Sequence, residues 1–143
     1  MRQRIVDPRP YSDEDEKFNL TLRPRTLNEM IGLAEQLEPL RIALRAAMER
    51  GEALEHVLLD GPPGLGKTTI AHAIANEIGS KLVQTSGPAL TRTGDLMGIL
   101  TGLGDKDVLL IDEIHRLPVA VEEFIYPAME DRKVQFVVDR GAF

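Results

Sequence analysis

A glycine-rich segment with a lysine and a threonine points most directly to chemistry. Gly61 to Thr68 reads GPPGLGKT, the spacing of a phosphate-binding loop. Glycines such as Gly64 and Gly66 let the main chain approach a triphosphate, so that several backbone N–H groups meet its oxygens. Lys67 adds a positive charge toward the outer phosphates, and Thr68 offers a hydroxyl to magnesium. The segment predicts a site for ATP or ADP with Mg²⁺; a glycine turn with an incidental lysine is disfavoured by the strand and helix patterns around it.

A pair of acids follows a strongly apolar run further along the chain. Val108 to Ile111 predicts a fully buried strand, and Asp112 and Glu113 come at its carboxyl end. Open α/β sheets bind their ligands at that end. Asp112 is therefore predicted to hold the magnesium, directly or through water, and Glu113 to orient and polarise the attacking water. The alternative is that both acids only favour the start of the next helix, and the upstream phosphate loop favours the catalytic interpretation.

The histidines give weaker signals. His56 and His72 are predicted to be partly buried side chains. His115 lies close enough to Asp112 in sequence to respond to a bound nucleotide, and a helix-surface position is equally compatible. The chain contains no cysteine and no histidine cluster, so a transition-metal site is not expected.

The elements that position these residues alternate between strand and helix patterns. Short apolar runs predict strands at 57–59, 81–85, 108–111 and 133–138. Apolar residues at spacings of three and four predict helices between them, two of which end at Gly51 and Gly79. Thr26 and Glu29 predict a capping box for a short helical turn, and Asp95 predicts the start of another helix. This alternation predicts an α/β fold with a parallel sheet flanked by helices.

Two segments fall outside that pattern. Residues 1–20 contain prolines and an acidic run without apolar periodicity, which predicts a flexible tail before a domain at 21–143. Asp139-Arg140-Gly141 is a turn signal, so 133–138 is predicted to be the first strand of a hairpin.

The composition agrees with a cytoplasmic protein. The chain has 143 residues, a net charge of −6 and no cysteine. A domain that binds nucleic acid by itself typically has a basic surface, and the negative net charge of this chain does not fit that expectation. No apolar run approaches the roughly 20 residues of a membrane span, and no signal peptide is recognisable.

From Leu22 to Phe143 the sequence resembles the RuvB family of AAA+ ATPases. The resemblance rests on LRP at 22–24, IG at 31–32, GPPGLGKTT at 61–69, TSGPA at 85–89, IDEIHRL at 111–117 and YPAMED at 126–131. It implies a hexameric ring that hydrolyses ATP and moves duplex DNA at Holliday junctions, assisted by the junction-binding protein RuvA. Another AAA+ machine, such as a clamp loader, would share the loop and the acids but not SGPAL or YPAMED.

The resemblance also implies a nucleotide pocket. Leu22 and Arg23 would line its adenine side; the other pocket residues would be Ile31, Gly61, Gly64, Leu65, Gly66, Lys67, Thr68, Thr69, Glu130, Asp131 and Arg132. The hairpin begun at Lys133 would contact RuvA. The family's sensor strand, arginine finger, lid and winged-helix domain are not found here, which implies that this chain binds nucleotide without efficient turnover. The sensor strand belongs between the strands at 57–59 and 108–111, so two central edges are expected to be unpaired.

Overall fold

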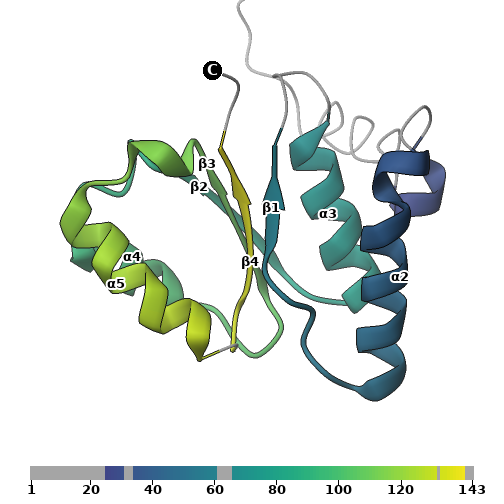
Figure 1. Cartoon of the computed structure of the whole chain (residues 1–143). Coiled ribbons are helices and arrows are strands. Elements are labelled where there is room, and N and C mark those ends of the chain that lie inside the picture. Colours follow the sequence, from purple (N-terminus) through teal and green to yellow (C-terminus); the bar gives the residue numbers. More distant parts are fainter. Residues whose placement is uncertain (1–24, 31–33, 61–65, 132, 141–143) are drawn as a thin grey trace, which may run out of the picture.

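The computed structural model describes residues 25–30, 34–60, 66–131 and 133–140, which form a sheet between two layers of helices (Figure 1). Strands β1 (Val57–Leu59), β2 (Leu82–Ser86), β3 (Val108–Asp112) and β4 (Gln135–Asp139) lie in the order β1-β4-β3-β2. All three strand pairs are parallel. The predicted α/β fold with a parallel sheet flanked by helices is confirmed.

The helices divide between the two faces of the sheet. They are η1 (Leu27–Glu29), α2 (Ala34–Arg50), α3 (Lys67–Ile78), α4 (Thr93–Thr101), η2 (Ile114–Arg116) and α5 (Val119–Glu130). Helices α2 and α3 cover one face, and α4 and α5 cover the other (Figure 1). None of the helices within the described ranges combines the length and apolarity that crossing a bilayer requires.

The sheet lies between two hydrophobic clusters, because successive side chains of the central strands point to opposite faces. In β3, Val108 and Leu110 pack toward α2 and α3, while Leu109 and Ile111 pack toward α4 and α5. Strand β4 alternates in the same way. Burial on both faces explains why these strands read as unbroken apolar runs.

Two predicted helix ends are confirmed. Gly51 follows α2 with a φ of 67°, and Gly79 follows α3 with a φ of 78°. Only glycine adopts this left-handed region without strain, so both helices stop where the sequence predicts.

Two predicted helix starts are different in the structure. Thr26 precedes η1 but makes no side-chain cap, and the carboxylate of Glu29 instead accepts the N–H of Arg25 at 2.9 Å. Asp95 lies inside the first turn of α4, where it accepts the N–H of Arg92 at 3.0 Å. In both cases the acid reaches back to the chain before the helix, which satisfies a donor that the helix itself cannot.

The predicted hairpin is wrong within the described residues. Strand β4 lies in the middle of the sheet, where Val137 is in register with Val57 of β1 and with Leu110 of β3. The expectation of two unpaired central edges is wrong for the same reason, because β4 pairs with both. Phe136, Val137 and Val138 are consecutive apolar residues, and such a run is stable only where both faces are covered.

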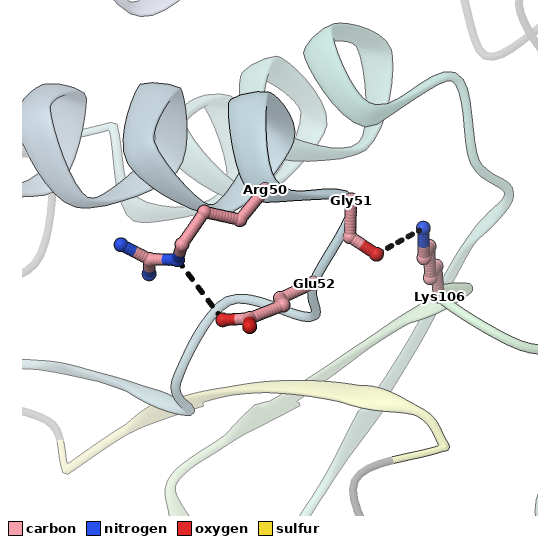
Figure 2. Close-up of polar contacts among 4 residues, drawn as sticks. All are labelled: Arg50, Gly51, Glu52 and Lys106. Atoms are coloured by element: carbon pink, nitrogen blue, oxygen red, sulfur yellow. Dashed lines mark hydrogen bonds and ion pairs between the residues drawn. The ribbon is translucent and has the colours of Figure 1, made fainter.

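Loop residues make polar contacts with one another at the amino ends of the strands (Figure 2). The Nε of Arg50 donates to the Glu52 carboxylate at 3.0 Å, and the Nζ of Lys106 donates to the carbonyl of Gly51 at 3.4 Å. Gly51, Glu52 and Lys106 also line a cavity of about 180 Å³. This end of the sheet lies opposite the end to which the sequence assigns the chemistry.

His56 joins the chain before β1 to both β4 and α5. Its Nδ1 accepts the N–H of Phe136 at 3.1 Å, so the proton of the neutral ring is on Nε2, which donates to the carbonyl of Met129. The ring also packs edge-on against Phe136 at 5.2 Å. The predicted partly buried position is confirmed, and His56 also positions the start of β4.

Candidate nucleotide-binding site

Helix α3 begins at the last glycine of the phosphate-loop pattern. Gly66 has a φ of 76°, and its carbonyl accepts the N–H of Ile70 at 2.9 Å. Residues 61–65 lie outside the described residues, so the structure places only the end of the loop, from Gly66 onward. Lys67 is the first residue of α3, which puts its charge beside the unpaired N–H groups of a helix start.

Lys67 reaches across to the carboxyl end of β4. Its Nζ donates to Oδ1 of Asp139 at 2.7 Å, and the two side chains are only 11% and 9% exposed. Asp139 is in register with Leu59, the last residue of β1, so this acid lies directly beside the strand that leads into the phosphate loop. The short distance and the burial make this a charge-assisted hydrogen bond largely shielded from water.

Asp112 lies next to this pair at the end of β3. It is exposed, and its Oδ1 accepts the N–H of Glu113 at 2.9 Å. The pKa of Asp112 is raised, mainly because the carboxyl is partly desolvated. A hydrogen bond and charge repulsion from Asp139 raise the pKa further, whereas the hydrogen bond from the Glu113 N–H lowers it. Lys67, Asp139 and Asp112 therefore lie together where β3 and β4 end and α3 begins.

Glu113 is held in an uncommon backbone conformation after β3. Its φ of 50° lies in the left-handed region, which non-glycine residues adopt rarely. Its carboxylate lies 3.6 Å from a guanidinium nitrogen of Arg116. Although Glu113 precedes η2, its side chain makes no capping hydrogen bond, so the helix-capping alternative does not explain this residue.

Gly87 makes the turn at Glu113 possible, and the sequence reasoning missed this role. Its N–H donates to the carbonyl of Asp112 at 2.8 Å. A Cβ on Gly87 would lie 2.3 Å from the carbonyl oxygen of Glu113, which is far inside van der Waals contact. A glycine two residues after the predicted strand at 81–85 is the signal that could have identified it.

Asp139 is the second residue that the sequence reasoning missed as part of the site. The turn signal predicts a hairpin turn at Asp139, whereas in the structure this residue is 6% exposed at the end of a central strand. A lone polar residue that ends a run as apolar as Phe136–Val138 was the available signal, since such residues meet the ligand edge of parallel sheets.

The other predicted site residues fall into three groups. Thr68 and Thr69 lie in the first turn of α3 next to Lys67, where Thr68 is exposed and Thr69 half-buried. Glu130 and Asp131 are exposed at the end of α5, beside the amino ends of the strands, so one copy of the chain does not bring them to Lys67. The predicted pocket residues that lie outside the described residues are Leu22, Arg23, Ile31, Gly61, Gly64, Leu65 and Arg132.

Comparisons with known proteins all point to the same family. Residues 22–143 match the model of the Holliday junction DNA helicase RuvB P-loop domain. The chain is 55% identical to the branch migration complex subunit RuvB of Chloroflexus aggregans over 97% of its own length and 39% of the relative's. It is also 55% identical to the RuvB subunit of Oenococcus oeni, of which it covers 41%. The chain thus spans about two fifths of the length of these curated relatives.

Solved structures agree with this match. The Thermotoga maritima RuvB Holliday junction branch migration motor superposes with a TM-score of 0.77 at 50% identity, over 83% of this chain and 42% of that one. A mutant of the same protein gives a TM-score of 0.81 at 49% identity, over 85% and 43%. Because the family model covers nearly all of the sequence and these structures share its fold, the chain belongs to the RuvB P-loop domain family.

Proposed function

We propose that this chain is the ATP-binding part of a RuvB motor that drives Holliday junction branch migration in recombination and repair. The observation that carries the proposal is the position of Lys67 at the start of α3, within hydrogen-bonding distance of an acid on the neighbouring strand end. This places the lysine of the phosphate-loop pattern at the carboxyl end of a parallel sheet, where nucleotides bind in this class of fold. SGPAL and YPAMED, together with the family match, disfavour a clamp loader.

The proposed roles follow from the chemistry of each side chain. Lys67 would bind the outer phosphates, and the left-handed Gly66 would present the first N–H groups of α3 to them. The hydroxyl of Thr68 and the carboxylate of Asp112 are the hard oxygen donors that suit Mg²⁺, and both residues are exposed. Bound magnesium would neutralise charge on the phosphates during transfer. Glu113 would orient the attacking water.

The roles proposed for the remaining pocket residues rest on the family resemblance. Leu22 and Arg23 would line the adenine side, with Ile31, Gly61, Gly64, Leu65 and Thr69 completing the pocket. We leave Glu130 and Asp131 out of this proposal, because the end of α5 lies at the amino ends of the strands. A place for Arg132 near the nucleotide rests on the resemblance alone.

We further propose that this 143-residue chain turns ATP over slowly. Glu113 has Arg116 as an ion-pair partner and Lys67 has Asp139, so each must change partner before it can act on water or phosphate. A finger arginine from a neighbouring subunit typically contributes a factor of about 10³ to 10⁵ in rate, which a single copy does not supply to itself.

The partners of the motor are proposed from family membership. They are duplex DNA at a Holliday junction, a RuvA-like junction-binding protein and further copies of the chain in a homo-hexamer, and the proposed location is the cytoplasm. The central position of β4 removes the hairpin as the basis for the RuvA contact. Sedimentation of the chain with and without ATP tests the hexamer, with a single monomeric species as the outcome against it.

Nucleotide titration tests the central proposal. A fluorescent ATP analogue should bind the chain, and Lys67→Ala should greatly weaken the binding. Because Lys67→Ala leaves Asp139 without its cation, Lys67→Ala/Asp139→Asn serves as the matched control, which lacks the lysine but retains no buried acid. Binding by this double variant with unchanged affinity would show that the loop is structural.

Turnover is measured by the release of phosphate by the chain, with the same double variant as the blank. In a longer RuvB, Glu113→Gln should still bind ATP but no longer hydrolyse it.

A further inference from the structure

We propose that Met30 is a positioning residue for the phosphate loop, because its side chain packs against the glycine at which the loop ends. The inference rests on the proposed nucleotide site and adds to it a residue that acts on the loop rather than on the nucleotide. Met30 follows η1 directly and is only 9% exposed. Its role therefore has to come from what its side chain contacts inside the protein.

The contact joins the end of the Met30 side chain to Gly66. A Cβ on Gly66 would lie 3.6 Å from the Cε methyl of Met30, which is ordinary van der Waals distance. The next two atoms, at 3.8 and 3.9 Å, belong to Thr69 of the same helix, so Met30 provides the close contact from another element. Glycine has more backbone freedom than any other residue, and a neighbour packed against it restricts that freedom.

The packing of η1 on α3 keeps Met30 in this place. The N–H of Met30 donates to the carbonyl of Leu27 at 3.3 Å. Leu27 is 2% exposed and belongs to the same hydrophobic cluster as Ile70 and Ile74 of α3. Leu27 thus anchors the short helix on α3, and the Met30 side chain extends from the end of that anchor to Gly66.

The conformation of Gly66 sets the direction of the phosphate-binding groups. Its φ of 76° is left-handed, and its carbonyl accepts the N–H of Ile70 at 2.9 Å, which begins the hydrogen bonding of α3. The next residue, Lys67, starts the helix, so a rotation at Gly66 would turn both the lysine and the first N–H groups away from a bound phosphate. A group held in its binding conformation by packing loses less entropy when the ligand arrives.

The consequence is that Met30 raises the affinity for nucleotide from outside the binding site. When only a fraction of the molecules holds Gly66 in the binding conformation, the measured dissociation constant exceeds the intrinsic one by the inverse of that fraction. If loss of the Met30 contact leaves about one tenth of the molecules in that conformation, affinity falls about tenfold.

The first arm of the test measures affinity. A fluorescent ATP analogue is titrated into the unaltered chain, Met30→Val, Met30→Leu and Leu27→Val, each shown by circular dichroism to be folded at the temperature of the titration. Valine is too short to reach Gly66, whereas leucine retains most of the length of methionine. Leu27→Val is the matched control, since it removes apolar volume from the same cluster without shortening the side chain that contacts Gly66.

The expected pattern separates positioning from general stability. Met30→Val should bind about tenfold more weakly than the unaltered chain, while Met30→Leu and Leu27→Val should remain close to it. Unchanged affinity in Met30→Val, or an equal loss in Leu27→Val, overturns the proposal.

The second arm does not depend on nucleotide. Amide hydrogen exchange is followed by NMR at Ile70, whose N–H bonds to the Gly66 carbonyl, and at Ile74, in the middle of the same helix. In Met30→Val the exchange of Ile70 should accelerate several-fold more than that of Ile74, whereas Leu27→Val should affect both alike. If this pattern is found but neither the unaltered chain nor any variant binds ATP, the proposed function fails and the positioning of Gly66 stands. If Ile70 and Ile74 accelerate equally in Met30→Val, Met30 does not hold Gly66 and the inference fails, whatever the ATP titration shows.

Discussion

Replacing Lys67 by alanine should destabilise the nucleotide-free protein as well as abolish nucleotide binding. The stability effect follows from the ion pair at the end of β4, because the variant leaves the Asp139 carboxylate only 9% exposed and without its cation. Truncating one partner of a buried pair typically costs about 3–5 kcal/mol, more than the pair itself contributes, because a shielded charge remains.

A ceiling on this loss comes from protonation. An isolated carboxylate with a reference pKa of about 3.9 can be neutralised at pH 7 for about 4 kcal/mol, at about 1.36 kcal/mol per pH unit. The penalty of the unpaired charge does not exceed this cost, and the remaining exposure of Asp139 lowers that penalty further. We expect Lys67→Ala to lower the free energy of unfolding by about 2–4 kcal/mol at pH 7.

Urea unfolding at two pH values measures the effect. At pH 5 neutralising the carboxylate costs only about 1.5 kcal/mol, so the destabilisation should shrink to that size or less. Lys67→Ala/Asp139→Asn should recover most of the stability at pH 7, since no buried charge remains. A loss below about 1 kcal/mol at pH 7, or the same loss at both pH values, would mean that the pair is as weak as an exposed one.

Three further outcomes are expected. Gly87→Ala should destabilise the fold by about 1–3 kcal/mol and lower ATP turnover in a longer RuvB, since the new Cβ collides with the carbonyl of Glu113; unchanged urea midpoint and turnover would refute this. The pKa of Asp112 is raised above 3.8 in the folded protein, so its protonated carboxyl stabilises the fold fully below pH 3.8 and this stabilisation is lost as the pH rises through the raised pKa; Asp112→Asn should therefore flatten the pH dependence of unfolding above pH 3.8. His56→Ala should cost about 1–3 kcal/mol, because the N–H of Phe136 loses its acceptor, whereas His56→Gln should recover part of it.

Local patterns predicted the individual elements well. The run before the glycine loop, the isoleucine spacing of α3 and the apolar stretch of β3 each lie within one element, so the residues that decide the element are adjacent in sequence. The glycines after α2 and α3 mark their ends for the same reason. These signals also positioned Lys67 and Asp112 at the carboxyl end of the sheet.

The order of the strands was not predictable from the same signals. Gln135–Asp139 is as compatible with a hairpin as with a central strand when only its turn signal is read, because strand pairing depends on residues far away in sequence. Its three consecutive apolar residues favoured burial on both faces, and that signal should outweigh the turn signal. The Lys67–Asp139 pair could not be predicted, since it depends on which strand lies beside β1.

The central position of β4 also determines when the sheet can close as the chain folds. At the start of β4, the side-chain amide of Gln135 donates to the carbonyl of Glu55 and the backbone N–H of Phe136 donates to the ring of His56, each 80 positions earlier. As the chain leaves the ribosome, β1 therefore emerges long before the strand that pairs with it here, and its hydrogen-bonding groups stay solvated until then. Contacts that distant slow folding, because a long loop must be ordered before any pairing compensates for it. We expect the β2–β3 pair to form first and the slowest folding phase to report the docking of β1 against β4.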